Sequence, residues 1–310
     1  MLIGVDHAVY GLADRQTMSF ELIWEGESVR AIAEAPPHRL IGVEHGRLVR
    51  YENDNRIPDG VVGHDIACLL ILARNPLRFL VGTEEAHLYQ YVEGTSGPHP
   101  LAQFDNLSCR QTWYTPWGGP PAVRSLAAAP DGVTVYADIH VGSIMRSSDR
   151  GVTWAPVTGD LHEDVHQVAT CRSARGRVYA TTAMAVWISN DGGRSWLDRG
   201  AGLQHRYGRA IAVHPDKPDC LLASVSDGPH GGNGQLFQSS DAGCRWQHVS
   251  GEFPETTRGN IDTHQLIFDH TGTGWAAVEH DLYASGDEGK SWTRIWHAPE
   301  RIRYLAVGLE

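Results

Sequence analysis

The chain has 310 residues, of which 41% are hydrophobic and 20% are charged. This hydrophobic fraction is sufficient for a large core, and 34 glycines, 16 prolines and 10 tryptophans indicate many turns packed with aromatic rings. The composition therefore argues against a helical bundle and against a disordered chain. Because the formal net charge is −11, we expect no extended surface for nucleic acid or for an anionic membrane.

The N-terminal residues, the apolar stretches and the cysteines together predict where the protein is located. The first residues lack a basic start followed by an apolar run, so we expect no signal peptide. No apolar stretch approaches the length of about 18 residues that a membrane-spanning helix needs. The five cysteines include no C-x-x-C pair and are odd in number, which predicts free thiols and a cytoplasmic protein.

In chain order, the sequence begins with a short apolar strand at residues 2–6, and seven apolar segments then recur along the chain. Each segment aligns with the others through Leu, Ile or Val, and a short strand follows all but the last. The second position of the aligned segments forms a column of residues: Arg30, Ala67, Arg124, His166, Arg209, His264 and Arg303.

A second repeat occupies the C-terminal half of the chain. The pattern S-x-D-x-G-x-(S/T/R)-W occurs at residues 147–154, 189–196, 239–246 and 285–292, with starts 42, 50 and 46 residues apart. A short Asp side chain suits a tight turn, and Gly permits a positive φ there. The aspartates of this pattern are predicted to be structural: Asp149, Asp191, Asp241 and Asp287.

This pattern resembles the Asp-box (BNR) repeat of sialidase-like β-propellers, sortilin-type receptors and photosystem II assembly factors. The resemblance implies that each box lies on the hairpin between the third and fourth strands of a blade, away from the ligand face. Together with the seven aligned segments it predicts an all-β, seven-bladed propeller that forms one domain over residues 1–310. We expect residues 301–310 to complete the blade begun by residues 1–27, which leaves no open edge.

In such a propeller the innermost strands begin at one face, which we call the upper face, and the turns between second and third strands return to it. Histidine is frequent at these positions, often beside an acid. Histidines gathered at an axial opening can ligate Cu, Fe or Zn, with acids as orienting partners. The predicted metal ligands are His166, His264, His64, His280 and His140, and the predicted orienting acids are Asp164, Asp262 and Asp65. Alternatively, these acid–histidine pairs are only turn residues.

The arginines of the column support a different site. Several guanidinium groups around one opening would bind a carboxylate, phosphate or sulfate. The resemblance adds to this, because photosystem II assembly factors carry an arginine patch on their propeller. The predicted ligand-binding residues are Arg30, Arg124, Arg209, Arg303, His7, His45, Trp113, Tyr114 and Trp117. The alternatives are that the arginines pair with acids such as Glu34 or Asp65, and that the aromatic rings fill the space between blades.

These observations leave three functions open. The first is a metal-dependent enzyme, an oxidoreductase or lyase, that acts on a small anionic or aromatic substrate. The second is a non-catalytic propeller that binds an anion or a protein partner. The third is a sialidase-like glycoside hydrolase, for which the only motif is Arg-Ile-Pro at residues 56–58. No Tyr–Glu pair of the kind that sialidases use could be assigned.

Overall fold

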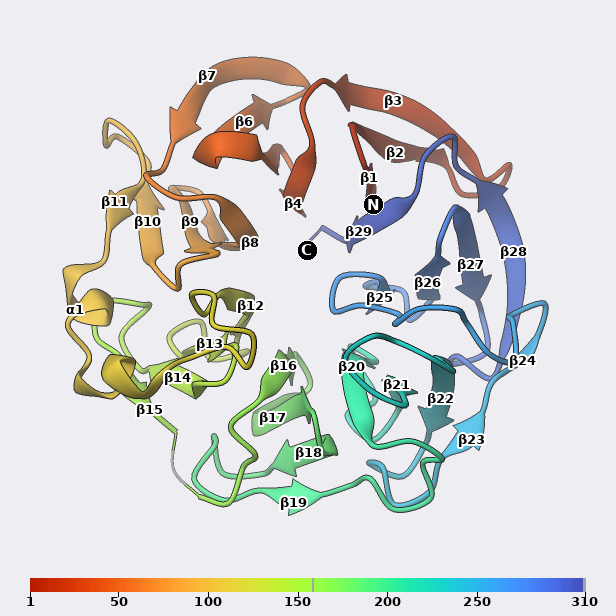
Figure 1. The fold of residues 1–310 in the computed structure, drawn as a ribbon. Coiled ribbons are helices and arrows are strands. Elements are labelled where there is room, and N and C mark those ends of the chain that lie inside the picture. Colours follow the sequence, from red (N-terminus) through yellow and green to blue (C-terminus); the bar gives the residue numbers. More distant parts are fainter. Residues whose placement is uncertain (158, 309–310) are drawn as a thin grey trace.

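The computed structural model describes residues 1–157 and 159–308 (Figure 1). Its strands form seven sheets that are arranged as blades around a central axis, with the N-terminus and the last strand, β29, near that axis. From the innermost strand outward, the first three blades consist of β29 (Ile302–Ala306), β1 (Leu2–Val5), β2 (Ala8–Asp14) and β3 (Ser19–Glu25); β4 (Val29–Ala35), β5 (His38–Val43), β6 (Arg47–Glu52) and β7 (Asn55–Val61); and β8 (Ile66–Arg74), β9 (Leu77–Thr83), β10 (Leu88–Val92) and β11 (His99–Pro100).

The remaining four blades repeat this order. They consist of β12 (Val123–Ala128), β13 (Val135–Ile139), β14 (Ser143–Ser147) and β15 (Ala155–Pro156); β16 (Val165–Cys171), β17 (Ala174–Thr182), β18 (Ala185–Ser189) and β19 (Leu197–Asp198); β20 (Tyr207–Val213), β21 (Leu221–Ser226), β22 (Gln235–Ser239) and β23 (Gln247–His248); and β25 (Leu266–Phe268), β26 (Gly274–Val278), β27 (Asp281–Ser285) and β28 (Ser291–His297), with β24 (Ser250–Gly251) parallel to β28. Within the described residues, helical structure is limited to α1 (Ala102–Asp105) and the 3₁₀ helices η1 (Glu44–Gly46) and η2 (Ser108–Thr112). None of the helices in the described ranges is long and apolar enough to cross a membrane.

The prediction of an all-β, seven-bladed ring closed by the C-terminal strand is confirmed. β29 pairs antiparallel with β1, with Ile3 opposite Leu305 and Gly4 opposite Tyr304. The first sheet therefore contains the first and the last strand of the described residues. Of the predicted closing segment, residues 301–310, residues 309 and 310 lie outside the described residues.

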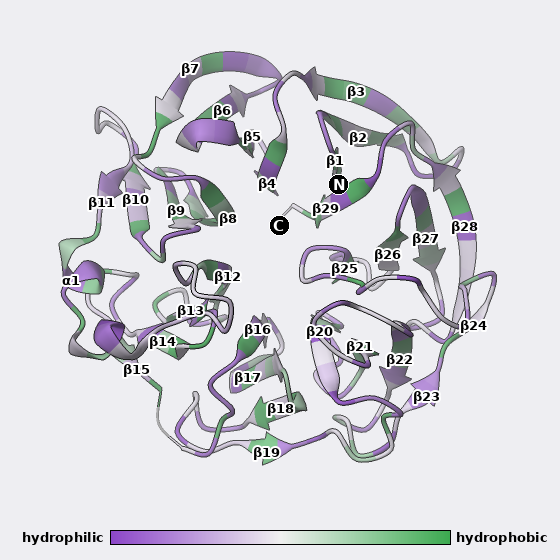
Figure 2. Ribbon diagram, viewed as in Figure 1, coloured by the Kyte–Doolittle hydropathy of each residue, from purple (hydrophilic) through white to green (hydrophobic). Residues whose placement is uncertain are grey.

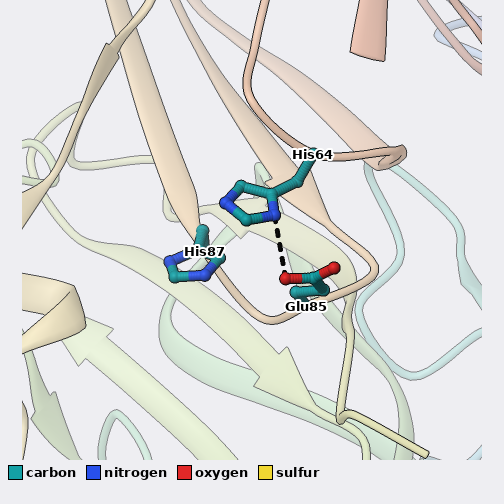
Figure 3. A group of neighbouring side chains, drawn as sticks. All are labelled: His64, Glu85 and His87. Carbon is teal, nitrogen blue, oxygen red and sulfur yellow. Dashed lines mark ion pairs between the residues drawn. The ribbon is translucent and has the colours of Figure 1, made fainter. Parts of the chain in front are cut away.

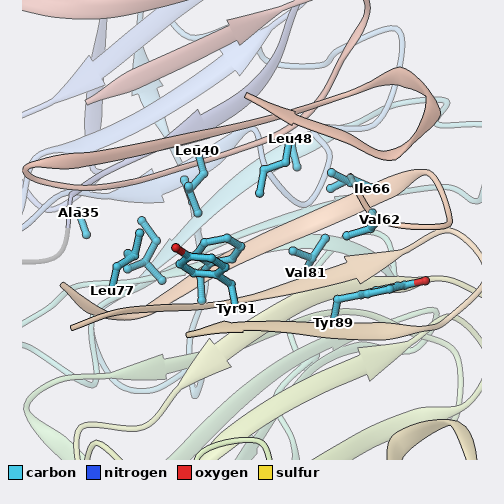
Figure 4. Packing of buried hydrophobic residues seen from close by; sticks show 13 residues of the cluster. Ala35, Leu40, Leu48, Val62, Ile66, Leu77, Val81, Tyr89 and Tyr91 are labelled. Atoms are coloured by element: carbon cyan, nitrogen blue, oxygen red, sulfur yellow. The ribbon is translucent and has the colours of Figure 1, made fainter. Parts of the chain in front are cut away.

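The hydrophobic core lies between the blades. Seven clusters of buried side chains are found in the described residues, and each joins two neighbouring sheets. Figure 4 shows the cluster between the second and third blades, where Leu40 and Leu48 of one sheet pack on Val81 and Tyr91 of the next. The outer strands β3 and β7 carry both hydrophobic and hydrophilic residues, and most of these residues are exposed or half-buried (Figure 2).

The four Asp boxes lie on the hairpins between the third and fourth strands of the last four blades, as the resemblance implied. In the box of the fifth blade, Asp191 Oδ1 accepts the backbone N–H groups of Arg194 and Ser195, each at 2.9 Å. These bonds, and that from the Ser195 hydroxyl, hold the pKa of Asp191 well below its usual range. Trp196 is buried in the cluster between the fourth and fifth blades. The boxes therefore serve to close hairpins and to fill the core at the lower face.

Candidate functional site

A cavity of about 360 Å³ lies where the innermost strands begin, and we call it the axial pocket. Most of its lining comes from the starts of these strands and from the long connection that follows β11. The lining includes five of the seven column positions: Ala67, Arg124, Arg209, His264 and Arg303. The other lining residues include Glu84, Thr115, Trp117, His140, Asp262 and Tyr304. The strand alignment made from the sequence thus gathers distant residues around one opening.

Three of the four column arginines form ion pairs with acids. The pairs are Arg30 with Glu44 (3.4 Å), Arg209 Nε with Asp262 (2.8 Å) and Arg303 with Asp6 (2.7 Å). Their partners are not the acids Glu34 and Asp65 considered from the sequence. Glu34 instead pairs with Arg39, and Asp65 is exposed. Much of the charge of these three arginines is therefore balanced within the protein.

Arg124 differs from the other three. Within the described residues it has no ion pair, and its buried Nη1, like the buried Nε of Arg30, has no hydrogen-bond partner. Burial, together with the nearby positive charge of Arg209, lowers the pKa of Arg124. Glu84 faces the same pocket, and desolvation raises the pKa of its carboxyl group. Arg124 thus places a guanidinium group without a paired anion in the wall of the pocket.

The histidines predicted as one metal group are separated in the structure. His166 is fully buried; its Nδ1 donates to the Gly208 carbonyl, and its Nε2 lies 3.2 Å from Asp164. His140 also faces Asp164, at 3.7 Å. Burial lowers the pKa of both imidazoles. Asp164 therefore stands beside His166 as predicted, within a buried group that also contains His140.

His264 has a different environment. Its Nε2 lies 3.1 Å from the Arg124 carbonyl, and burial lowers its pKa. Asp262, predicted to orient His264, instead accepts hydrogen bonds from Arg209. His280 stacks on His297 near the rim of the seventh blade. In the described residues these five histidines do not form one group with ligand atoms close enough to share an ion, so a metal site built from them stays a prediction.

The remaining predicted histidines lie on the rim. His7 contacts Glu300 at 3.3 Å, and His45 is exposed at a turn with a positive φ of 58°. His64 belongs to a compact group with Glu85 and His87 on the third blade (Figure 3). This is the group in the described residues whose His, Asp, Glu or Cys ligand atoms are close enough to share a metal ion.

The aromatic residues of the long connection divide into two kinds. Trp113 is buried beside Phe104 and beneath Arg110, so the prediction that it stacks on a ligand is wrong. Its ring instead fills the space between the third and fourth blades, which was the alternative role predicted for these aromatic residues. Trp117 is 66% exposed, lies 4.8 Å from the ring of His140 and borders the axial pocket. Tyr114 is exposed, with its hydroxyl on Glu163.

Sequence reasoning missed four polar residues near this face: Glu84, Glu85, His87 and Asp138. The first three belong to the turn between β9 and β10. This turn carries acids and a histidine, as do the other upper-face turns from which metal ligands were predicted. Their signal was therefore present in the sequence. Asp138 is fully buried on a second strand, and burial raises its pKa to about 7. Nothing in its local pattern distinguishes it from a surface acid.

The Arg-Ile-Pro motif does not contribute to the axial pocket. Arg56 lies on β7, the outermost strand of the second blade. Its guanidinium pairs with Asp59 at 2.9 Å. The motif therefore gives no support to a sialidase site.

A family model for sortilin, described as neurotensin receptor 3, matches residues 142–253, a segment that contains three of the four boxes. The chain is a seven-bladed β-propeller of the Asp-box type. This propeller is also similar in sequence to proteins named as xyloglucanases. A probable oligoxyloglucan-reducing end-specific xyloglucanase of Neosartorya fischeri is 28% identical over 201 residues, which cover 57% of this chain and 23% of that protein. A xyloglucanase of Hypocrea jecorina is 28% identical over 192 residues, which cover 59% of this chain and 21% of that protein.

Solved structures agree on the fold. An ancestral GH74 enzyme superposes with a TM-score of 0.65 at 15% identity, covering 96% of this propeller and 40% of that chain. The GH74 xyloglucanase from Xanthomonas campestris gives a TM-score of 0.60 at 17% identity. The superposition covers 86% of this propeller and 45% of that chain. The propeller spans only 16–23% of the length of the curated relatives it matches. At these identities the structural likeness concerns the fold alone.

Proposed function

We propose that this propeller binds a small anionic ligand, with a carboxylate or similar oxyanion, in the axial pocket. The observation that supports this most is the state of Arg124. A buried guanidinium with an N–H group that lacks a hydrogen-bond acceptor lowers the stability of the fold, unless an anion or a water molecule accepts that hydrogen bond. Guanidinium groups bind carboxylates through paired hydrogen bonds, and the cavity has room for a small molecule above Arg124.

The neighbouring groups support the same ligand class. Arg209 and Arg303 border the pocket and add positive charge, although each is paired with an acid. The lowered pKa of His140 and His264 keeps these rings neutral, so that they offer hydrogen bonds rather than charge. In the part of the chain that the structure describes, the axial histidines do not form a group whose ligand atoms could share one ion, so the function that we propose for the axis needs no metal.

Replacing Arg124 with Gln tests this proposal. The probes are sulfate, phosphate and small mono- and dicarboxylates, measured by calorimetry and by thermal shift at low ionic strength. A ligand at one hundred times its Kd should stabilise the wild type by about 2.7 kcal/mol. We expect Arg124→Gln to weaken its binding by about 10- to 100-fold, which corresponds to the loss of charged hydrogen bonds. Glu84→Gln should strengthen binding by roughly three- to tenfold, because it removes the opposing charge.

The matched control is Arg30→Gln, which changes the same column position in another blade. Arg30 pairs with Glu44 and is not among the residues that line the pocket, so its loss should leave affinity nearly unchanged. The proposal fails if no probe binds at millimolar concentration. It also fails if Arg124→Gln and Arg30→Gln weaken binding equally.

A second candidate is binding of an oligoxyloglucan at the upper face. Two observations favour it: the sequence similarity to proteins named as xyloglucanases, and the exposed ring of Trp117 beside the pocket. Flat sugar faces stack on such rings, and a buried plug such as Trp113 cannot take this role.

The two candidates respond to different substitutions. If an oligoxyloglucan binds, Trp117→Ala should lower its affinity by about three- to tenfold, because a stacking contact is lost. Arg124→Gln should have little effect on this ligand. The measurement is calorimetry with defined oligosaccharides, together with an assay for new reducing ends. Unchanged affinity in Trp117→Ala would exclude the ring as the binding surface.

A further inference from the structure

Two imidazoles and one carboxylate converge on the upper rim of the third blade, outside the axial pocket (Figure 3). One ligand atom each from His64, Glu85 and His87 can be chosen so that all lie within 4.8 Å of one another. His64 Nδ1 lies 2.9 Å from Glu85 Oε2, and the rings of His64 and His87 stack with centroids 4.2 Å apart. The three side chains come from two separate segments of the chain, the residues before β8 and the turn between β9 and β10.

The backbone holds this turn firmly. The buried Thr83 hydroxyl accepts the His87 N–H at 3.0 Å, and the Thr83 N–H donates to the His87 carbonyl at 3.1 Å. Arg110 Nη2 donates to the Glu85 carbonyl at 3.0 Å, which ties the turn to η2. Glu85 and His87 are therefore presented from a fixed loop rather than from a free one.

Asp105 at the end of α1 supplies the orienting contact for His87. Its carboxylate lies 2.8 Å from His87 Nδ1, which selects the tautomer protonated at that nitrogen. His87 Nε2 then carries the free lone pair that a metal needs. A carboxylate that orients a ligating imidazole in this way is a regular feature of metal sites. Asp105 also lies 3.9 Å from Arg110 Nη1, so it balances part of the positive charge of that guanidinium group.

We propose that His64, Glu85 and His87 form a binding site for a first-row divalent cation of the Zn²⁺ class, with water completing the coordination. Two imidazoles and one carboxylate are a ligand set that such ions accept. His64 and His87 are about one quarter exposed, at 27% and 24%, and Glu85 is 55% exposed, so an ion and its water can enter from solvent. Small rotations of the stacked rings would turn both lone pairs toward one ion.

The position suggests how such an ion would relate to the axial pocket. Glu84 lines the pocket, and its chain neighbour Glu85 belongs to the cation group. A cation held by Glu85 would therefore lie on the same rim as the proposed anion site. The two proposals rest on different side chains and can fail separately.

The test is titration of the purified, chelator-treated protein with Zn²⁺ alone, followed by calorimetry. We expect one ion per chain, and a loss of at least about 100-fold in affinity in the double variant His64→Ala, His87→Ala. Asp105→Asn should weaken binding by about 10- to 100-fold, because it removes only the orienting charge. Binding should weaken in acidic buffer, because protons compete with the ion for the imidazole nitrogens.

The matched control is the double variant His280→Ala, His297→Ala, which removes another stacked histidine pair on the upper face. Its rings lie 5.5 Å apart, with Asp281 2.7 Å from His297, and it does not form a three-ligand group. We expect full Zn²⁺ affinity in this control and in Arg124→Gln. Unchanged melting curves of the metal-free variants would show that folding is intact. The proposal is overturned if the wild type binds no stoichiometric Zn²⁺, or if both histidine-pair variants bind it equally.

Discussion

Deletion of residues 301–310 should yield a protein that is insoluble or lacks a cooperative melting transition. The deletion removes β29, the innermost strand of the first blade, and leaves the edge of β1 unpaired. Ile302 and Leu305 are buried between the first and seventh blades, and each contributes about 1.5–3 kcal/mol through burial. The unpaired edge of β1 and the neighbouring sheet faces that β29 covered add to this loss. The total loss of stability is therefore large compared with a typical net stability of about 5–15 kcal/mol.

The matched truncation removes only the residues after Ala306 and keeps β29 whole. We expect this shorter deletion to stay soluble and to melt cooperatively. The measurements are the soluble fraction after expression, light scattering and differential scanning calorimetry. A 301–310 deletion that melts at the wild-type temperature would show that the ring does not depend on its closing strand.

Asp138→Asn should change how stability depends on pH. Asp138 is fully buried on β13, where its Oδ1 accepts the Ser125 N–H at 2.6 Å and the Ser125 hydroxyl. Burial raises its pKa from 3.8 to about 7. The folded protein therefore binds a proton that the unfolded chain releases. Stability from this group is fully present below about pH 4 and is lost as pH rises toward 7.

The expected size follows from the shift of about three pKa units, which corresponds to about 4 kcal/mol. The wild type should lose this amount relative to Asp138→Asn between pH 4 and pH 8, measured by urea unfolding at each pH. The amide keeps an oxygen for Ser125 and cannot ionise, so any cost of the substitution should be constant with pH. A difference between the two proteins that does not vary with pH would contradict the prediction.

Asp131→Asn gives a control of opposite sign in the same blade. Partial burial raises the pKa of Asp131, but hydrogen bonds from Thr134 and Val133 outweigh this and lower it overall. Stability from Asp131 should be present above the unfolded pKa and should be lost as pH falls through the folded one. The free energy of unfolding of the wild type, relative to that of Asp131→Asn, should therefore rise with pH, whereas the same difference for Asp138→Asn falls with pH. The change should also occur at lower pH than the change for Asp138.

The repeats by themselves determined the architecture. Each inner strand and each Asp box reflects local chemistry: alternating apolar residues, a short Asp, a Gly with positive φ and a Trp that needs a core. These features recur at near-constant spacing, so the number of blades and the closure by the last strand could be read from them. The same spacing placed Arg124, Arg209, Arg303 and His264 at one opening, because equivalent positions of a repeat meet at the axis.

Only the tertiary structure decided which of these residues have partners. Arg209 and Arg124 look alike in the sequence, but Asp262 reaches Arg209 and no acid of the described residues pairs with Arg124. The histidines show the same limit: His166 is buried against the neighbouring blade, whereas His64 joins Glu85 and His87 across a turn. Side-chain pairing and burial depend on contacts between blades, and these contacts are not encoded in the period of the repeat.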